Sequence, residues 1–268
     1  MSGKIKKIPQ RTEFPSFNNP PINEVVCGMR FHPTDKLRIP HVGLLWNKFR
    51  ADYPILQHAQ IISTTRSEIP IDRATGVPIP RVWFINVAGD QLIQFQNDRF
   101  YFNWRKKETP YPRYQHIIDN FETVSSAVTD LFKEFDLGAL EPMEYELSYI
   151  NHIPRGIGWE ALDDLPEVFT DFIWNAPVER FLPYPEQVSW LAEFSLPEQR
   201  GQLIISLKQA IRIDDELPVL VYELKATGGD RENVARNWFD LAHEWLVLGF
   251  ADLTTNRMHK IWEVEENA

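Results

Sequence analysis

The chain is 268 residues long and carries 28 Lys and Arg against 38 Asp and Glu, a formal net charge of −10. Hydrophobic residues make up 43% of it and charged residues 25%, which excludes a disordered chain, a collagen-like repeat and a coiled-coil rod. The acidic excess argues against non-specific wrapping of nucleic acid, because Lys and Arg are needed to neutralise phosphates.

Hydrophobic periodicity predicts a strand, a helix, three strands and a long helix in the first half of the chain. A period of two marks the strands, and the spacing i, i+3, i+4 and i+7 marks the helices. The Pro- and Arg-rich segment 55–80 shows no clear pattern. We expect strands at 22–31, 81–87, 92–95 and 99–104, and helices at 42–49 and 117–135.

The second half repeats this order. In the middle strand of its last three, Leu203, Ile205, Leu207, Ile211 and Ile213 are expected to share one face. A stripe of Val234, Trp238, Leu241, Trp245 and Leu248 predicts the long helix. We expect strands at 145–153, 188–196, 202–213 and 219–226, with shorter helices at 168–173 and near 254–262.

The short connections between strands predict antiparallel sheets with helices on one face, an α+β architecture. The repeated order predicts two similar strand-helix-three-strand-helix units, a pseudo-duplication. We place an extended N-terminal arm at 1–20, a first unit at 21–139, and a second unit with the C-terminal helices at 140–268, packed as one globular body.

Signals for a membrane or for export are missing from the sequence. No run of about 18 apolar residues occurs, so no segment is expected to span a membrane. The basic start of the chain has no apolar stretch behind it and does not read as a signal peptide. Cys27 is the single cysteine, which excludes an internal disulfide and favours a reducing compartment. We therefore expect a cytoplasmic protein.

Motifs for the common chemistries are also missing. The sequence has no GxGxxG or GxxxxGK[ST] phosphate loop and no GxSxG nucleophile elbow. None of the histidines forms HExxH, and a single cysteine excludes a thiolate zinc site. Cys27 lies in an apolar strand and reads as a core residue. We expect no metal and no cofactor, and the sequence leans against an enzyme without deciding the question.

Three interpretations of function remain open. The first is a non-catalytic module that binds a protein or peptide, because 17 Phe, 9 Trp and 8 Tyr suffice for a groove as well as a core. The second is an enzyme or small-ligand receptor with a polar site between the halves. Its candidate residues lie at strand ends and on the last long helix, where they also suit the plainer role of satisfying backbone donors: Asn23, Glu24, Tyr149, Asn151 and His243.

The third interpretation is nucleic-acid binding through the hairpin that precedes the helix at 117–135. Basic residues interleaved with aromatic ones can hold phosphates and stack bases. The same alternation places Phe100, Phe102 and Trp104 on one face, as a core strand requires. The net charge disfavours this interpretation. Its candidates are Arg99, Arg105, Lys106, Lys107 and Arg113.

Three stretches carry a resemblance: 20–26, 99–114, and 242–245 together with 250–262. They are similar to a sporadically distributed bacterial family of uncharacterised cytoplasmic proteins of about this length. The resemblance covers nearly the whole chain and transfers no catalytic residue. It implies an accessory protein, and the sporadic distribution is typical of defence loci. An antitoxin, immunity or anti-phage component with another protein as its partner is the function that the resemblance favours.

Overall fold

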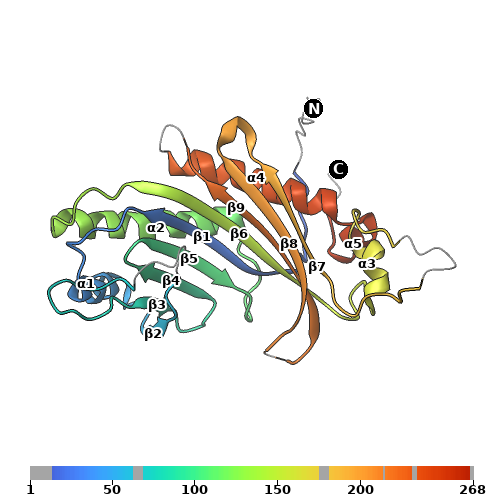
Figure 1. Ribbon diagram of the computed structural model, residues 1–268, viewed down its shortest axis with the longest axis horizontal. Coiled ribbons are helices and arrows are strands. Elements are labelled where there is room, and N and C mark those ends of the chain that lie inside the picture. The colour runs from blue at the N-terminus through green and yellow to red at the C-terminus, as the bar shows by residue number, and fades with distance from the viewer. Residues whose placement is uncertain (1–13, 63–68, 175–180, 214, 231–233, 266–268) are drawn as a thin grey trace.

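The computed structural model describes residues 14–62, 69–174, 181–213, 215–230 and 234–265 (Figure 1). The strands are β1 (Ile22–Phe31), β2 (Ile55–Ala59), β3 (Arg81–Ile85), β4 (Gln91–Gln96), β5 (Arg99–Arg105), β6 (Pro142–Pro154), β7 (Ser189–Ser195), β8 (Gly201–Ile211) and β9 (Pro218–Gly228). The helices are α1 (Ile39–Phe49), α2 (Arg113–Glu134), α3 (Leu165–Val168), α4 (Ala235–Leu253) and α5 (Asn256–Ile261), with 3₁₀ turns η1 (Leu162–Asp164) and η2 (Pro197–Gln199).

The described strands form a nine-stranded sheet with the order β2-β3-β4-β5-β1-β6-β9-β8-β7. Every neighbouring pair is antiparallel. The long strands β1 and β6 lie side by side at the centre, and the two outer strands are β2 and β7. The predicted α+β class with antiparallel pairing is therefore confirmed.

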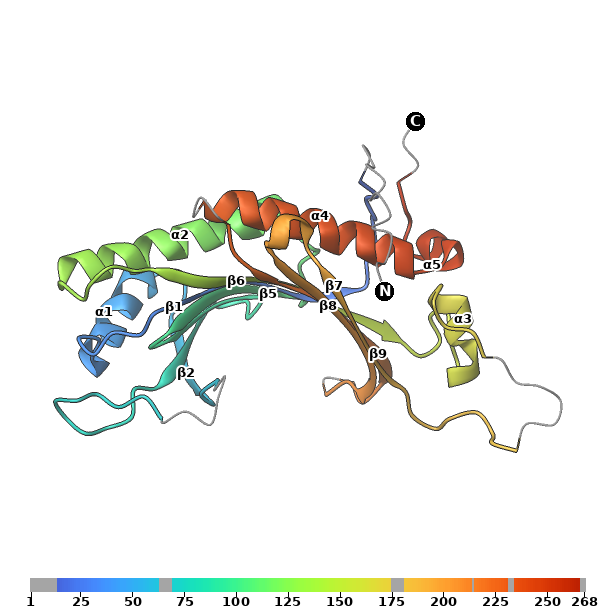
Figure 2. The same ribbon diagram turned by 45° about the horizontal axis from the view of Figure 1, so that its top comes forward.

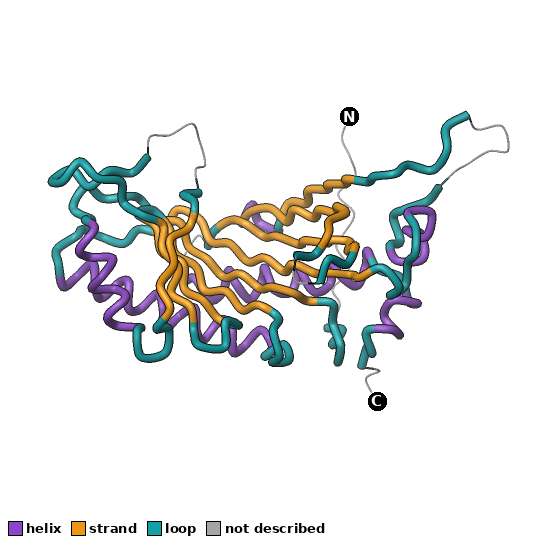
Figure 3. The backbone as a smooth tube through the Cα atoms, turned by 90° about the horizontal axis from the view of Figure 1, so that it is seen from below, coloured by secondary structure: helices purple, strands orange, loops and turns teal. Residues whose placement is uncertain are grey.

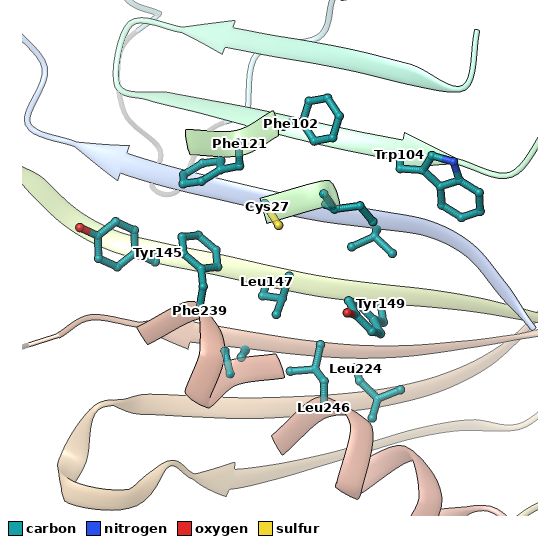
Figure 4. Packing of buried hydrophobic residues seen from close by; sticks show 14 of the residues in the cluster. Cys27, Phe102, Trp104, Phe121, Tyr145, Leu147, Tyr149, Leu224, Phe239 and Leu246 are labelled. Atoms are coloured by element: carbon teal, nitrogen blue, oxygen red, sulfur yellow. The ribbon is translucent and has the colours of Figure 1, made fainter. Parts of the chain in front are cut away.

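The two long helices α2 and α4 cover one face of the sheet, and the other face is concave and open (Figure 2). Alternation along β1 directs Val25, Cys27 and Met29 towards the helices, where each is buried. Phe121 of α2 and Phe239 of α4 pack onto this layer (Figure 4). Burial raises the pKa of the Cys27 thiol, which supports the prediction of a core residue.

A β-bulge at Asn23 puts Ile22 on the same face of β1 as Val25. Ile22 pairs with Asn151 of β6, whereas Glu24 pairs with Ile150, so two residues of β1 oppose one of β6. Ile22 consequently joins Val25 on the helix-covered face. Glu24 lies on the open face.

Several predicted elements need correction. The segment 55–80 contains β2, which the sequence does not reveal because its side chains are nearly all exposed and do not alternate. The face predicted for β8 extends too far, since Ile211 and Ile213 are 61% and 93% exposed. The helix predicted at 168–173 is wrong, because α3 covers Leu165–Val168 and Phe169 forms a β-bridge with Thr254.

The phase predicted for α4 is also wrong. Trp245 and Leu248 are only partly buried, and the buried stripe is displaced by about one residue. Apolar side chains surround much of this helix, so its sequence fits either phase. The buried residues of α4 are Trp238, Phe239, Ala242, Leu246 and Phe250.

Among the described residues, no helix combines the length and the apolar character that crossing a bilayer demands.

Gly28 of β1 lies opposite Tyr101 of β5, and the Tyr101 ring occupies the place of a β-carbon at Gly28. Gly28→Ala should therefore force this buried ring to move and lower the free energy of unfolding by about 1–3 kcal/mol. Gly43→Ala is the control, because Gly43 is exposed in α1 and its β-carbon meets nothing within 4 Å. That change should raise stability by about 0.5–1 kcal/mol. Urea unfolding measures both, and equal effects would contradict the expected overlap.

Candidate functional site

A cavity of about 360 Å³ lies between the first turn of α2, the middle of α4 and the centre of the sheet. Its walls are mainly aromatic: Phe14, Phe17, Tyr111, Tyr114, Tyr149 and Phe250. Its polar lining consists of Ser16, Arg113, Gln115, Asn151 and His243. We call this space the helix-side cavity.

The outer wall of the helix-side cavity is the segment before β1, residues 14–17, which passes alongside α4 (Figures 1 and 2). Backbone hydrogen bonds tie this segment to the other end of the described chain. The Glu265 N–H donates to Ser16 O at 2.8 Å, and the Asn18 N–H donates to Glu263 O at 3.0 Å. Phe17 also forms a β-bridge with Val264. The wall therefore depends on residues about 245 positions apart meeting in space.

Asn151 of β6 lines the cavity and carries a buried acceptor that has no partner among the described residues. Its Nδ2 donates to Tyr222 O at 3.0 Å and lies 3.4 Å from Tyr149 O. Because both of these groups are carbonyls, the NH₂ end of the amide must face them, and Oδ1 must face the other way. Oδ1 is buried and has no hydrogen-bond partner among the described residues.

A chain of hydrogen bonds crosses the cavity wall from α4 to the segment before α2. Tyr149 Oη lies 2.9 Å from His243 Nδ1 and 3.2 Å from Tyr111 Oη. The tautomer of His243 sets the direction of donation. In either direction, one donor hydrogen remains at an end of this series of hydrogen bonds, on the His243 ring or on the Tyr111 hydroxyl. Both residues line the cavity.

Stacking fixes the orientation of His243. The Tyr114 ring of α2 lies 3.9 Å from the His243 ring, with 6° between their planes. The Tyr114 hydroxyl donates to Asp240 Oδ1 at 2.8 Å, one turn before His243 on α4. Arg236 also links the helices, donating to Gln115 Oε1 at 2.8 Å. The histidine is thereby clamped between two helices and the central strand.

The ionisable groups of the cavity are held neutral. Burial lowers the pKa of His243 to about 4, against a smaller opposite effect of Asp240. Burial raises the pKa of the hydroxyls of Tyr111, Tyr114 and Tyr149. At neutral pH the cavity therefore presents hydrogen-bonding groups without charge, apart from Arg113 at its rim.

The structure brings three of the five predicted receptor residues together. Tyr149 and Asn151 share the helix-covered face of β6, as their predicted alternation requires, and His243 meets them from α4. Asn23 forms the bulge and lies outside the cavity lining. Glu24 is on the open face, where its Oε1 accepts from Asn103 Nδ2 at 2.6 Å and burial raises its pKa.

The five basic residues of the nucleic-acid interpretation are divided between two faces. Arg99 and Arg105 line a cleft on the open face. Arg113 lies on the helix side, where it donates to Ser16 Oγ at 3.1 Å and Phe17 O at 3.2 Å. Lys106 and Lys107 are exposed in the connection between β5 and α2. Nucleic-acid binding stays a prediction, without a common surface for these residues.

Sequence reasoning missed Tyr111 and the wall at 14–17. Tyr111 stands between two prolines outside any periodic segment, so no pattern indicates its direction. The Tyr111 ring packs on the Trp104 ring, with 5.4 Å between their centroids, and this contact links Tyr111 to the core. The described residues contain no group of three or more potential metal ligands.

Comparison with known proteins finds no family model and no curated protein that matches this chain.

The lowered pKa of His243 makes stability depend on pH. Between pH 6.5 and about 4, His243 binds a proton in the unfolded chain but not in the folded chain. The contribution of this residue to the free energy of unfolding is therefore complete above pH 6.5 and is lost as the pH falls towards 4. In His243→Gln, the decrease in the free energy of unfolding between pH 6.5 and about 4 should be smaller than in wild type by up to about 3 kcal/mol. Urea unfolding at a series of pH values measures it. The exposed His116→Gln is the control, and identical curves for wild type and His243→Gln would refute the assignment.

Proposed function

We propose that the protein is a receptor for an uncharged small molecule with an apolar body and a hydrogen-bond donor, such as a hydroxyl or an amide N–H. The observation that carries this proposal is an aromatic cavity whose lining includes Asn151, a residue with a buried acceptor, Oδ1, that has no partner among the described residues. Leaving such a group unpaired costs about 1–3 kcal/mol. A ligand that donates to it recovers that cost on binding.

The charge state of the lining supports an uncharged ligand. Moving an ionised group out of water is unfavourable unless a counter-charge receives it. His243 and the three tyrosines are neutral at pH 7. The one charged residue of the described lining is Arg113, whose guanidinium already contacts Ser16, Phe17 and, at 4.0 Å, Glu265.

The volume and chemistry of the cavity support binding over catalysis. About 360 Å³ falls in the lower part of the range for small-molecule pockets, which are mostly apolar with a few placed polar groups. A general base works best with a pKa near the working pH. The pKa of about 4 makes His243 a weak base, and the described lining contains no Asp, Glu or Cys.

The wider interpretation from the sequence, a cytoplasmic accessory protein of the sporadic bacterial family with a protein partner in toxin–antitoxin or anti-phage defence, stays a prediction. Within that interpretation the protein binds another protein or a peptide, whereas the receptor proposed here binds a small molecule. The buried acceptor of Asn151 favours the receptor.

We also propose that the two halves arose by duplication. The strand order supports this idea, because β1 and β6 each lie at the centre beside the last strand of their own half, β5 and β9. In both halves the earlier strands follow outward in reverse order, and a long helix comes next in the chain. The first half differs in having the additional strand β2, and its helix α1 has 11 residues where α3, at the same place in the second half, has 4.

Uncharged aromatic and aliphatic alcohols and amides should bind, and their matched carboxylates should bind at least about tenfold more weakly. Benzamide, benzoate and toluene form one such set, measured by ligand-observed NMR titration. Val247→Trp should abolish binding, because Val247 lines the cavity and the indole would fill it. Leu248→Trp is the matched control, since its side chain lines a different groove on α4. Binding that survives Val247→Trp, or carboxylates that bind equally well, would overturn the proposal.

Asn151→Leu keeps the approximate size of the side chain and removes the acceptor. Wild type should prefer benzamide over toluene, because only benzamide donates to Oδ1, and the variant should lose about tenfold of that preference. The ratio of the two dissociation constants measures this, so a general loss of stability does not alter the result. Thermal unfolding of the same samples verifies that the variant is folded. An unchanged ratio would show that Asn151 does not contact the ligand.

A further inference from the structure

The long helices leave one face of the sheet uncovered (Figure 3). A second cleft, of about 480 Å³, lies on this face. Side chains from β1, β3, β4, β5, β6 and β9 line it. The sheet itself separates it from the helix-side cavity. Its charged lining is Arg30, Arg81, Arg99, Arg105 and Lys225 with Glu24, Glu144 and Glu146. This cleft is thus more basic than acidic, in a chain whose net charge is −10.

Three of these arginines form a row across neighbouring strands. Arg99 of β5 is the direct cross-strand partner of Arg30 of β1. Arg81 of β3 lies on the other side of Arg99, across β4. We call Arg30, Arg81 and Arg99 the arginine row. Like charges directly opposite each other on a sheet are destabilising unless something compensates them.

The compensation within the described residues is incomplete. Asp98 binds Arg99 with two hydrogen bonds, at 2.9 and 2.7 Å. Glu144 Oε2 lies 3.5 Å from Arg30 Nε. The described acceptors of Arg81 are uncharged, namely Gln60 O at 2.9 Å and Gln94 Oε1. The row therefore has three guanidinium groups and two carboxylates.

Two further observations show strain in the row. Arg30 Nε is buried and finds no hydrogen-bond acceptor among the described residues, although Glu144 is near. Burial lowers the pKa of Arg81, Tyr101 opposes this effect, and the positive charge of Arg99 adds a smaller lowering. Both features are those of a site that lacks a negative, hydrogen-bond-accepting group.

We propose that the arginine row binds an oxyanion, the phosphate or carboxylate group of a ligand. The planar N–H groups of arginine match the oxygens of both groups in a bidentate manner. The anion supplies the third negative charge, reduces the repulsion between Arg81 and Arg99, and offers an acceptor to Arg30 Nε. The site is independent of the proposed receptor function, because it lies on the other face of the sheet.

Calorimetric titration of the full chain with inorganic phosphate and, separately, with acetate tests this proposal, at ionic strength held constant with sodium chloride. At least one of the two should bind saturably, and the stronger one identifies the phosphate or the carboxylate as the natural group. Arg81→Gln should weaken this binding by about tenfold or more. Arg50→Gln, an exposed arginine after α1, is the matched control and should bind like wild type.

Arg81→Lys separates charge from geometry and guards against a folding defect in Arg81→Gln. It should retain part of the affinity, because lysine keeps the charge but loses the bidentate contact. Saturable binding that is equal in wild type, Arg81→Gln and Arg50→Gln would place the anion elsewhere and overturn the proposal. Absence of saturable binding for both anions would overturn it as well.

Discussion

The antiparallel pairing of β1 with β6 is the interaction on which the rest of this structure depends. These two central strands carry the core layer of Val25, Cys27 and Leu147 on one face and the base of the open cleft on the other. Each half of the sheet extends outward from one of them. The regular register from Glu24 to Arg30 decides which polar groups lie under the helices and which face the open side, and the bulge at Asn23 returns Ile22 to the helix-covered face.

The elements that bury one face were predictable from the sequence, because one-sided burial imposes a period. The alternation of Tyr145, Leu147 and Tyr149 indicates β6 and its inner face correctly, and all three are buried. The edge strand β2 was not predictable, since it contributes backbone pairing with β3 and little apolar contact. In α4 the apolar residues outnumber the positions that the core can cover, so the sequence leaves the rotation of the helix undetermined.

The candidate site was predictable where it follows those periods and not where it depends on irregular structure. Tyr149 and Asn151 are placed by alternation alone. Glu24 was misplaced because it precedes Val25 in a regular part of β1, so alternation puts it on the open face, whereas the bulge at Asn23 changes the face of Ile22. The wall at 14–17 arises from pairing between segments far apart in the chain, which no local pattern can show.

That pairing makes the described chain nearly a closed ring, joined where Phe17 meets Val264. Contacts between such distant segments carry the largest loop-closure entropy in the molecule, although this cost grows only slowly with length. The segment at 14–17 is therefore expected to dock last during folding and to detach first in local unfolding. Detachment of this segment would remove the outer wall of the helix-side cavity. A ligand bound there, as proposed above, would contact residues 14–17 together with α4 and would so stabilise the closed arrangement.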